Sequence, residues 1–195
     1  MSVLVIVLIA VAVLLVLFVV LTFNGFIRKR NRTQEAWSQI DVELKRRHDL
    51  IPNLVETVKG YAAHERQTFE AVTQARAAAV TASTTGDLHQ IGPAENALSQ
   101  TLRSLMVVAE NYPQLRAVET FTQLQEQLTA TEDKIAFARR YYNGSVRDYN
   151  IALQSFPRNV IAGMFGFKAV PFFQAEESDR VAPTVSFGSG TAPSQ

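Results

Sequence analysis

The fold of this chain follows from residues 37–79, WSQIDVELKRRHDLIPNLVETVKGYAAHERQTFEAVTQARAAA, where apolar side chains recur at heptad spacing. The first heptad position holds Trp37, Leu44, Ile51, Val58, Glu65, Val72 and Ala79, and the position three residues later holds Ile40, Arg47, Leu54, Tyr61, Thr68 and Ala75. Such a seam, sustained for about six heptads, predicts a helix that packs lengthwise against other helices. Val55, Ala62 and Phe69 widen the apolar stripe, which suits a bundle helix with more than one neighbour.

Pro52 lies inside this stretch. A proline removes one helical hydrogen bond and kinks or breaks a helix. The heptad phase is the same on both sides of Pro52, so we predict a kink within one helix that runs from Thr33 to about Ala82. Because no capping box marks Thr33, we expect the preceding apolar segment to continue directly into this helix.

Arg47 and Glu65 are the charged exceptions in the seam. One interpretation is that both are buried or half-buried and hydrogen-bonded to other helices, where they fix the register. The other is that they recognise a charged group on a partner. The candidate interaction residues are Arg47, Pro52, Asn53, Glu65 and Phe69. The wide stripe around Phe69 has two interpretations, the surface of a homo-oligomer or the core of one chain.

Val3 to Phe23 form an uncharged run of 21 residues, about 31 Å of helix, which is enough to cross a bilayer. A cleaved signal peptide fits poorly, because the run is long and no basic residue precedes it. The membrane-flanking residues are Arg28, Lys29, Arg30 and Arg32, which follow the run directly. By the positive-inside rule we predict a single-pass protein of the bacterial inner (cytoplasmic) membrane, with the N-terminus outside and the C-terminal domain in the cytoplasm.

The rest of the chain also has helical patterns. By composition, residues 81–92 predict a loop, and Pro93 is expected to open a helix with Ala94, Leu98, Thr101, Leu105, Val108 and Tyr112 on its apolar face. A phase change at Pro113 predicts a helix break, although it leaves open whether the chain reverses there. The next helix has large residues every seven positions and is expected to end before Pro157: Phe121, Leu128, Ile135, Tyr142, Tyr149 and Phe156.

Residues 157–173 are rich in apolar and aromatic side chains and predict a short helix with a packed extension. They either cover the open end of the bundle or touch lipid. We therefore divide the chain into a transmembrane anchor (1–27), a basic cluster (28–32), a helical bundle (33–173) and a disordered tail (174–195). The predicted fold is all-α, with a transmembrane helix followed by an elongated antiparallel bundle of three to four helices.

Several separated motifs resemble the LemA family of bacterial membrane proteins. They are AWSQIDVELK (36–45), RRHDLIPNLVETVKGYAAHE (46–65), AENYPQLRA (109–117), the pair Thr131–Glu132, ARRYYN (138–143) and FGF (165–167). The resemblance implies the same anchoring and helical domain. It also implies that some relatives help to organise bacterial membrane compartments, and it implies no established enzymatic activity.

The composition points away from several functions. The chain has no cysteine, which excludes disulfides and thiolate metal sites. Four of the 19 basic residues lie in the basic cluster, and the remaining 15 face 18 acidic residues, a net charge of −3 that argues against nucleic-acid binding. His64–Glu65 begins a zinc-protease pattern, but Thr68 stands where the second histidine is required.

We therefore expect neither catalysis nor a bound metal or cofactor. The predicted function is that of a membrane-anchored interaction or scaffold protein. Its partners are the lipid bilayer, other proteins, and in one interpretation further copies of itself. The alternatives are an adaptor for a membrane signalling or quality-control partner, and an enzyme with an unrecognised site in the bundle.

Overall fold

The computed structural model describes residues 3–173, and all of its regular elements in that range are helices. This confirms the all-α prediction. The helices are α1 (Val3–Lys59), α2 (Arg66–Thr85), α3 (Leu88–Glu110), α4 (Pro113–Arg116), α5 (Glu119–Gln154) and α6 (Arg158–Met164). The predicted disordered tail, residues 174–195, lies outside the described residues.

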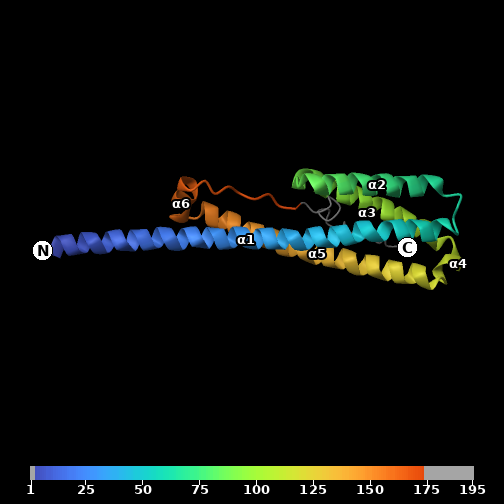
Figure 1. Ribbon diagram of the computed structural model, residues 1–195, viewed down its shortest axis with the longest axis horizontal. Coiled ribbons are helices and arrows are strands. Elements are labelled where there is room, and N and C mark those ends of the chain that lie inside the picture. Colours follow the sequence, from blue (N-terminus) through green and yellow to red (C-terminus); the bar gives the residue numbers. More distant parts are fainter. Residues whose placement is uncertain (1–2, 174–195) are drawn as a thin grey trace, which may run out of the picture.

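The four long helices form an elongated antiparallel bundle, with α1 packed along α5 and α2 packed along α3 (Figure 1). The bundle encloses only the C-terminal part of α1. The N-terminal part projects beyond it as a single helix whose side chains are exposed (Figure 1). Within residues 3–173, α1 is the one helix that is long and apolar enough to cross a membrane.

Helix α1 is continuous over 57 residues, about 85 Å. The apolar segment thus runs into the bundle without an intervening loop, as the missing capping box at Thr33 predicted. Pro52 lies inside α1, so the prediction that the helix continues through this proline is confirmed.

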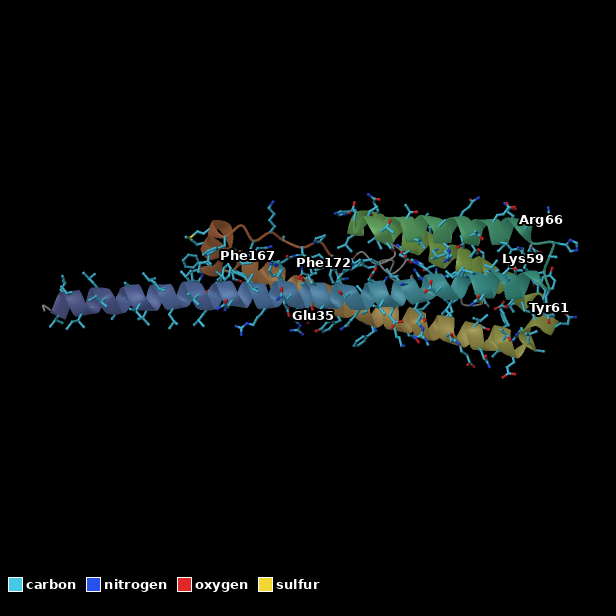
Figure 2. The ribbon with its side chains drawn as sticks, in the orientation of Figure 1. Glu35, Lys59, Tyr61, Arg66, Phe167 and Phe172 are labelled. Carbon is cyan, nitrogen blue, oxygen red and sulfur yellow. The ribbon has the colours of Figure 1, made fainter. Side chains whose placement is uncertain are left out.

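The predicted helix from Thr33 to Ala82 is wrong beyond Lys59, because α1 ends there and the chain turns back into α2. Gly60 follows the last helical residue, and the amides of Tyr61 and Ala62 both donate to the carbonyl of Val58. This turn lies at the end of the bundle opposite the N-terminus (Figure 2). The turn is nearly seven residues long. Apolar residues on either side of it therefore keep a spacing of seven in the sequence, although the chain reverses between them.

The predicted loop at residues 81–92 is also mostly helical. Helix α2 continues to Thr85, and the hydroxyls of Thr81, Thr84 and Thr85 donate to carbonyls one turn earlier. These bonds keep a polar threonine-rich run compatible with a helix. Gly86 then adopts the left-handed conformation (φ 68°) that ends helices at low steric cost.

Helix α3 begins earlier than predicted, and Pro93 is an interior residue. The start is set by Asp87, whose carboxylate accepts a hydrogen bond from the amide of His89. An aspartate at the N-cap satisfies one of the free amides of the first turn. The helix starts where this cap is available, five residues before Pro93.

The predicted break at Pro113 is confirmed, and the chain reverses there through the short helix α4. Helix α5 ends two residues before Phe156. Five of the six large heptad residues are buried, together with Leu124 and the small residues Thr131, Ala138, Ser145 and Ala152. Phe156 is the exception: it is 82% exposed, because the helix has ended and the chain turns into α6.

Residues 165–173 return along the bundle as an extended segment beside α1 and α5 (Figures 1 and 2). The amide side chains of Asn143 and Asn150 each both donate to and accept from its backbone, at Phe173 and Val170 respectively. The Tyr142 hydroxyl donates to the Pro171 carbonyl over 3.0 Å. The extension thus packs against the bundle as predicted.

Candidate functional site

Arg47 forms an ion-pair network that joins three helices. It lies on α1 with only 2% of its surface exposed, and its guanidinium pairs with the buried carboxylate of Glu95 on α3. It also donates to Glu132 on α5, over 2.8 and 3.1 Å, and to the Ser99 hydroxyl on α3 over 3.1 Å. A buried guanidinium of this kind is stable only when carboxylates compensate its charge.

Pro52 brings in the fourth long helix. A proline in a helix leaves free the carbonyl four residues earlier, which here belongs to His48. That carbonyl accepts a hydrogen bond of 2.7 Å from the Nε of Arg76 on α2. The proline therefore creates an acceptor on α1 that α2 occupies. We call Arg47, His48, Arg76, Glu95 and Glu132 the four-helix junction.

The His48 side chain completes this junction. Its Nε2 lies 2.8 Å from the second carboxylate oxygen of Glu95. Burial lowers the pKa of His48 to about 4, and the positive charges of Arg47 and Arg76 act in the same direction. The negative charge of Asp49 acts in the opposite direction and is the smaller effect. His48 is therefore neutral at neutral pH and donates from Nε2, since a carboxylate can only accept.

A groove of about 630 Å³ lies beside the junction, between α3 and α5. The backbones of these two helices approach each other less closely than the paired helices do, and Arg47 bridges them from α1. We call this the α3–α5 groove. Its lining combines apolar side chains such as Leu102, Met106, Val107 and Leu128 with charged ones. The charged residues are Arg47, Arg103, Arg139, Glu95, Glu110, Glu132 and Asp133.

The side chains of the other predicted interaction residues lie outside the four-helix junction. Pro52 and Asn53 are exposed on α1, on the side away from the core. Glu65 is half-buried in the N-cap position of α2, so it does not share a network with Arg47. Phe69 is 5% exposed and belongs to the main core cluster. The wide apolar stripe around Phe69 is thus part of the core of one chain. Self-association stays a prediction, but this stripe no longer supplies a surface for it.

The basic cluster lies where α1 enters the bundle. Arg32 donates from Nε to the Tyr141 hydroxyl on α5 over 3.1 Å, and its guanidinium lies over the same ring. Arg28 and Arg30 are exposed and Lys29 is half-buried. The four cations therefore surround α1 directly after its apolar segment.

Glu95 and Glu132 are partners of Arg47 that the apolar pattern does not predict. That pattern predicts Ala94 on the apolar face of α3, whereas the buried face follows Ile91, Glu95, Leu98, Leu102, Leu105 and Ala109. A signal was present, because a glutamate at helical spacing among these apolar residues needs a buried cation. For Glu132 the sequence offers only the resemblance of the pair Thr131–Glu132 to the family.

The junction suits binding and register better than catalysis. Its charges neutralise one another, and the neighbouring Ser99 hydroxyl accepts a hydrogen bond from Arg47 rather than bonding to His48. Within residues 3–173, no group of three or more metal-ligating side chains could hold a metal ion. The groove therefore offers fixed charges and an apolar wall to a ligand.

Known proteins resemble the chain in sequence. A model of the LemA family matches residues 36–187. Magnetosome protein MamQ 2 and magnetosome protein MamQ 1 of Paramagnetospirillum magneticum are each 30% identical over 175 residues, which cover 78% of this chain and 64% of theirs. Protein LemA of Metamycoplasma hominis is 28% identical over 160 residues, 81% of this chain and 71% of its own. The chain thus spans less than two thirds of the length of the two MamQ proteins.

Proposed function

Because this chain belongs to the LemA family, we propose that it is a membrane-anchored scaffold protein whose helical bundle holds protein partners at a fixed position above the bilayer. Membrane association follows from the exposed apolar part of α1. The relatives named as magnetosome proteins support a role in organising membranes or membrane protein assemblies. None of the names of the matched relatives denotes an enzymatic activity.

One observation carries this proposal: α1 passes without interruption from the apolar segment into the bundle. A flexible loop at that point would let the domain move freely over the membrane. A continuous helix instead transmits the orientation of the span to the bundle. The four-helix junction then fixes α2, α3 and α5 to the same helix through Arg47, His48 and Pro52.

The proposed location is the bacterial inner membrane, with the bundle in the cytoplasm. The support is the cluster Arg28, Lys29, Arg30 and Arg32, which immediately follows the uncharged segment. A reporter fused after Gln195 tests this orientation. Green fluorescent protein fused there should fluoresce, whereas alkaline phosphatase activity from the same position would contradict a cytoplasmic domain.

The α3–α5 groove is the proposed contact surface for a partner. Its volume of about 630 Å³ accommodates side chains of a helix or an extended segment, and charges of both signs along its lining suit a partner of mixed charge. The net charge of −3 beyond residue 32 makes nucleic acid a poor partner. Proteins of the same membrane are therefore the proposed class.

Photo-crosslinking in intact membranes tests this surface. A photoreactive amino acid replaces Val107, which is exposed and lines the groove, or Tyr61, which is exposed in the turn after α1. We expect a discrete protein adduct from the Val107 position and none of that size from the Tyr61 position. Equal adducts from both positions, or none from either, would contradict the proposed surface. Turnover of a small substrate by the purified protein would instead support the enzyme alternative.

A further inference from the structure

The corner between α5 and α6 lies beside the last turns of the apolar segment of α1. Phe26, Tyr149, Ala152, Ile161 and Ala162 form a buried cluster, and Val19 and Leu153 pack against it. The Phe23 ring meets the ring of Phe165 at 4.9 Å and that of Phe167 at 5.6 Å between centroids (Figure 2 labels Phe167). The corner therefore reaches the level of residues that belong to the uncharged run.

This corner also exposes large apolar side chains. Phe156 is 82% exposed and Met164 is 74% exposed, and Val160 and Phe165 are at least half exposed. Ile161 and Ala162 of the same short helix are buried against α1 and α5. Helix α6 thus has one apolar face for the bundle and another that the described residues leave uncovered. Such a patch marks a contact with a protein or a membrane.

The charges around the corner favour a membrane. Residues 3–34 and 149–173 contain no acidic side chain. The same two ranges contain six cations, Arg28, Lys29, Arg30, Arg32, Arg158 and Lys168. Anionic headgroups attract such a cluster, and apolar side chains beside it enter the boundary between headgroups and acyl chains.

We propose that the α5–α6 corner is a second membrane contact. Phe156, Val160, Met164 and Phe165 insert into the leaflet that α1 leaves, and Arg158 and Lys168 bind its anionic headgroups. The occupant is the lipid of the same membrane, because α1 holds the corner at that depth. Val19, which packs against the corner, lies four residues before the end of the uncharged run at Phe23, or about 6 Å along the helix. This inference rests on the proposal that α1 spans the bilayer.

The absence of cysteine from the sequence allows spin labels at single introduced cysteines. The full chain is placed in vesicles of phosphatidylcholine with phosphatidylglycerol. Phe156→Cys and Met164→Cys report on the corner, and helical circular dichroism verifies that each variant is folded. Leu15→Cys in the apolar segment is the control for lipid, and Val107→Cys on α3 is the control for water. The measurement is accessibility of the label to oxygen and to a water-soluble nickel complex.

We expect both corner labels to shift toward the oxygen-accessible behaviour of Leu15→Cys. If the corner labels match Val107→Cys while the label at Leu15→Cys is accessible to oxygen, the second contact is overturned and the anchor stays intact. If the label at Leu15→Cys is also accessible to the nickel complex, the proposed anchor is itself contradicted. Labels shielded from both reagents with spin–spin broadening would overturn the proposal in favour of contact with a second copy.

The headgroup contact has its own control. With Arg158→Gln and Lys168→Gln together, or in vesicles of phosphatidylcholine alone, we expect the corner labels to move toward water. An unchanged depth under both conditions would show that Arg158 and Lys168 do not bind anionic headgroups and would overturn that part of the proposal.

Discussion

Replacing Glu95 with glutamine tests the four-helix junction most severely. The substitution keeps the size of the side chain but removes the one buried carboxylate that compensates Arg47. Glu132 remains, yet 40% of its side chain is exposed, so water screens much of its attraction. Removing one partner of a buried pair typically costs about 3–5 kcal/mol, because a buried charge is left uncompensated. We expect a loss in that range, a factor of about 160 to 4,700 in the unfolding equilibrium constant.

The assay is urea unfolding of the full chain in detergent, followed by the fluorescence of the single tryptophan. Trp37 lies in the bundle, with its ring 5.7 Å from that of Tyr142 and 5.8 Å from that of Phe173. Glu110→Gln is the matched control, because Glu110 is exposed on the same helix. We expect this control to change stability by less than about 0.5 kcal/mol.

A loss for Glu95→Gln no larger than that of the control would show that Glu95 does not compensate the buried charge of Arg47. A double-mutant cycle checks the cause. Arg47→Met and Glu95→Met should each be costly alone, whereas the combined variant should lose less than the sum, because neither charge is then left unpaired. Strict additivity would mean that the two side chains do not stabilise each other.

Four further substitutions test individual contacts in the bundle. Pro52→Ala should stay folded with little net change in stability, because relief of the helix penalty of proline, about 3 kcal/mol, is offset where the restored helical hydrogen bond competes with Arg76 for the same carbonyl. Loss of the bundle's helical signal would contradict this. The pKa of His48 is about 4 in the folded protein and about 6.5 in the unfolded one, so the unfolded state binds more protons between these pH values, and the free energy of unfolding should fall by up to about 3 kcal/mol as the pH drops from 6.5 to 4. His48→Gln should remove this pH dependence, and identical stability profiles for the variant and the wild-type protein would contradict the prediction. Asn150→Ala should cost about 1–3 kcal/mol and speed hydrogen exchange in the extended segment after α6, so unchanged exchange there would count against these hydrogen bonds. Phe69→Glu should unfold the bundle or lower its free energy of unfolding by at least about 3 kcal/mol. If the wild-type protein is an oligomer and the variant is a folded monomer, Phe69 lies in an interface between copies instead.

Much of the fold could be predicted because its signals are local and physical. The uncharged run and the lack of a capping box at Thr33 indicate a helix that continues from the apolar segment into the bundle. The change of heptad phase at Pro113 indicates that one helix ends there and another begins. The turn after Lys59 could not be found in this way, because six residues of turn and a reversal preserve the heptad count. The start of α3 is not predicted by Pro93, because the capping side chain of Asp87 allows the helix to begin five residues earlier.

The junction was only half predictable. Arg47 is visible as a charge in an apolar seam, and a buried partner follows from physics. Its partners lie 48 and 85 residues further along the chain, so only the packing of the helices decides which carboxylates reach it. The role of Pro52 was also beyond the sequence, because it depends on Arg76 of another helix reaching the carbonyl that the proline frees.

A distance between two spin labels on α1 tests directly whether one rigid helix couples the proposed membrane span to the bundle. Phe18→Cys lies in the apolar segment and Val42→Cys in the bundle, and both positions are exposed on α1. For a continuous helix in vesicles we expect a narrow distribution centred at about 36 Å, from 24 residues at about 1.5 Å each. A broad distribution, or one centred well below that distance, would mean a hinge between span and bundle and would contradict this coupling.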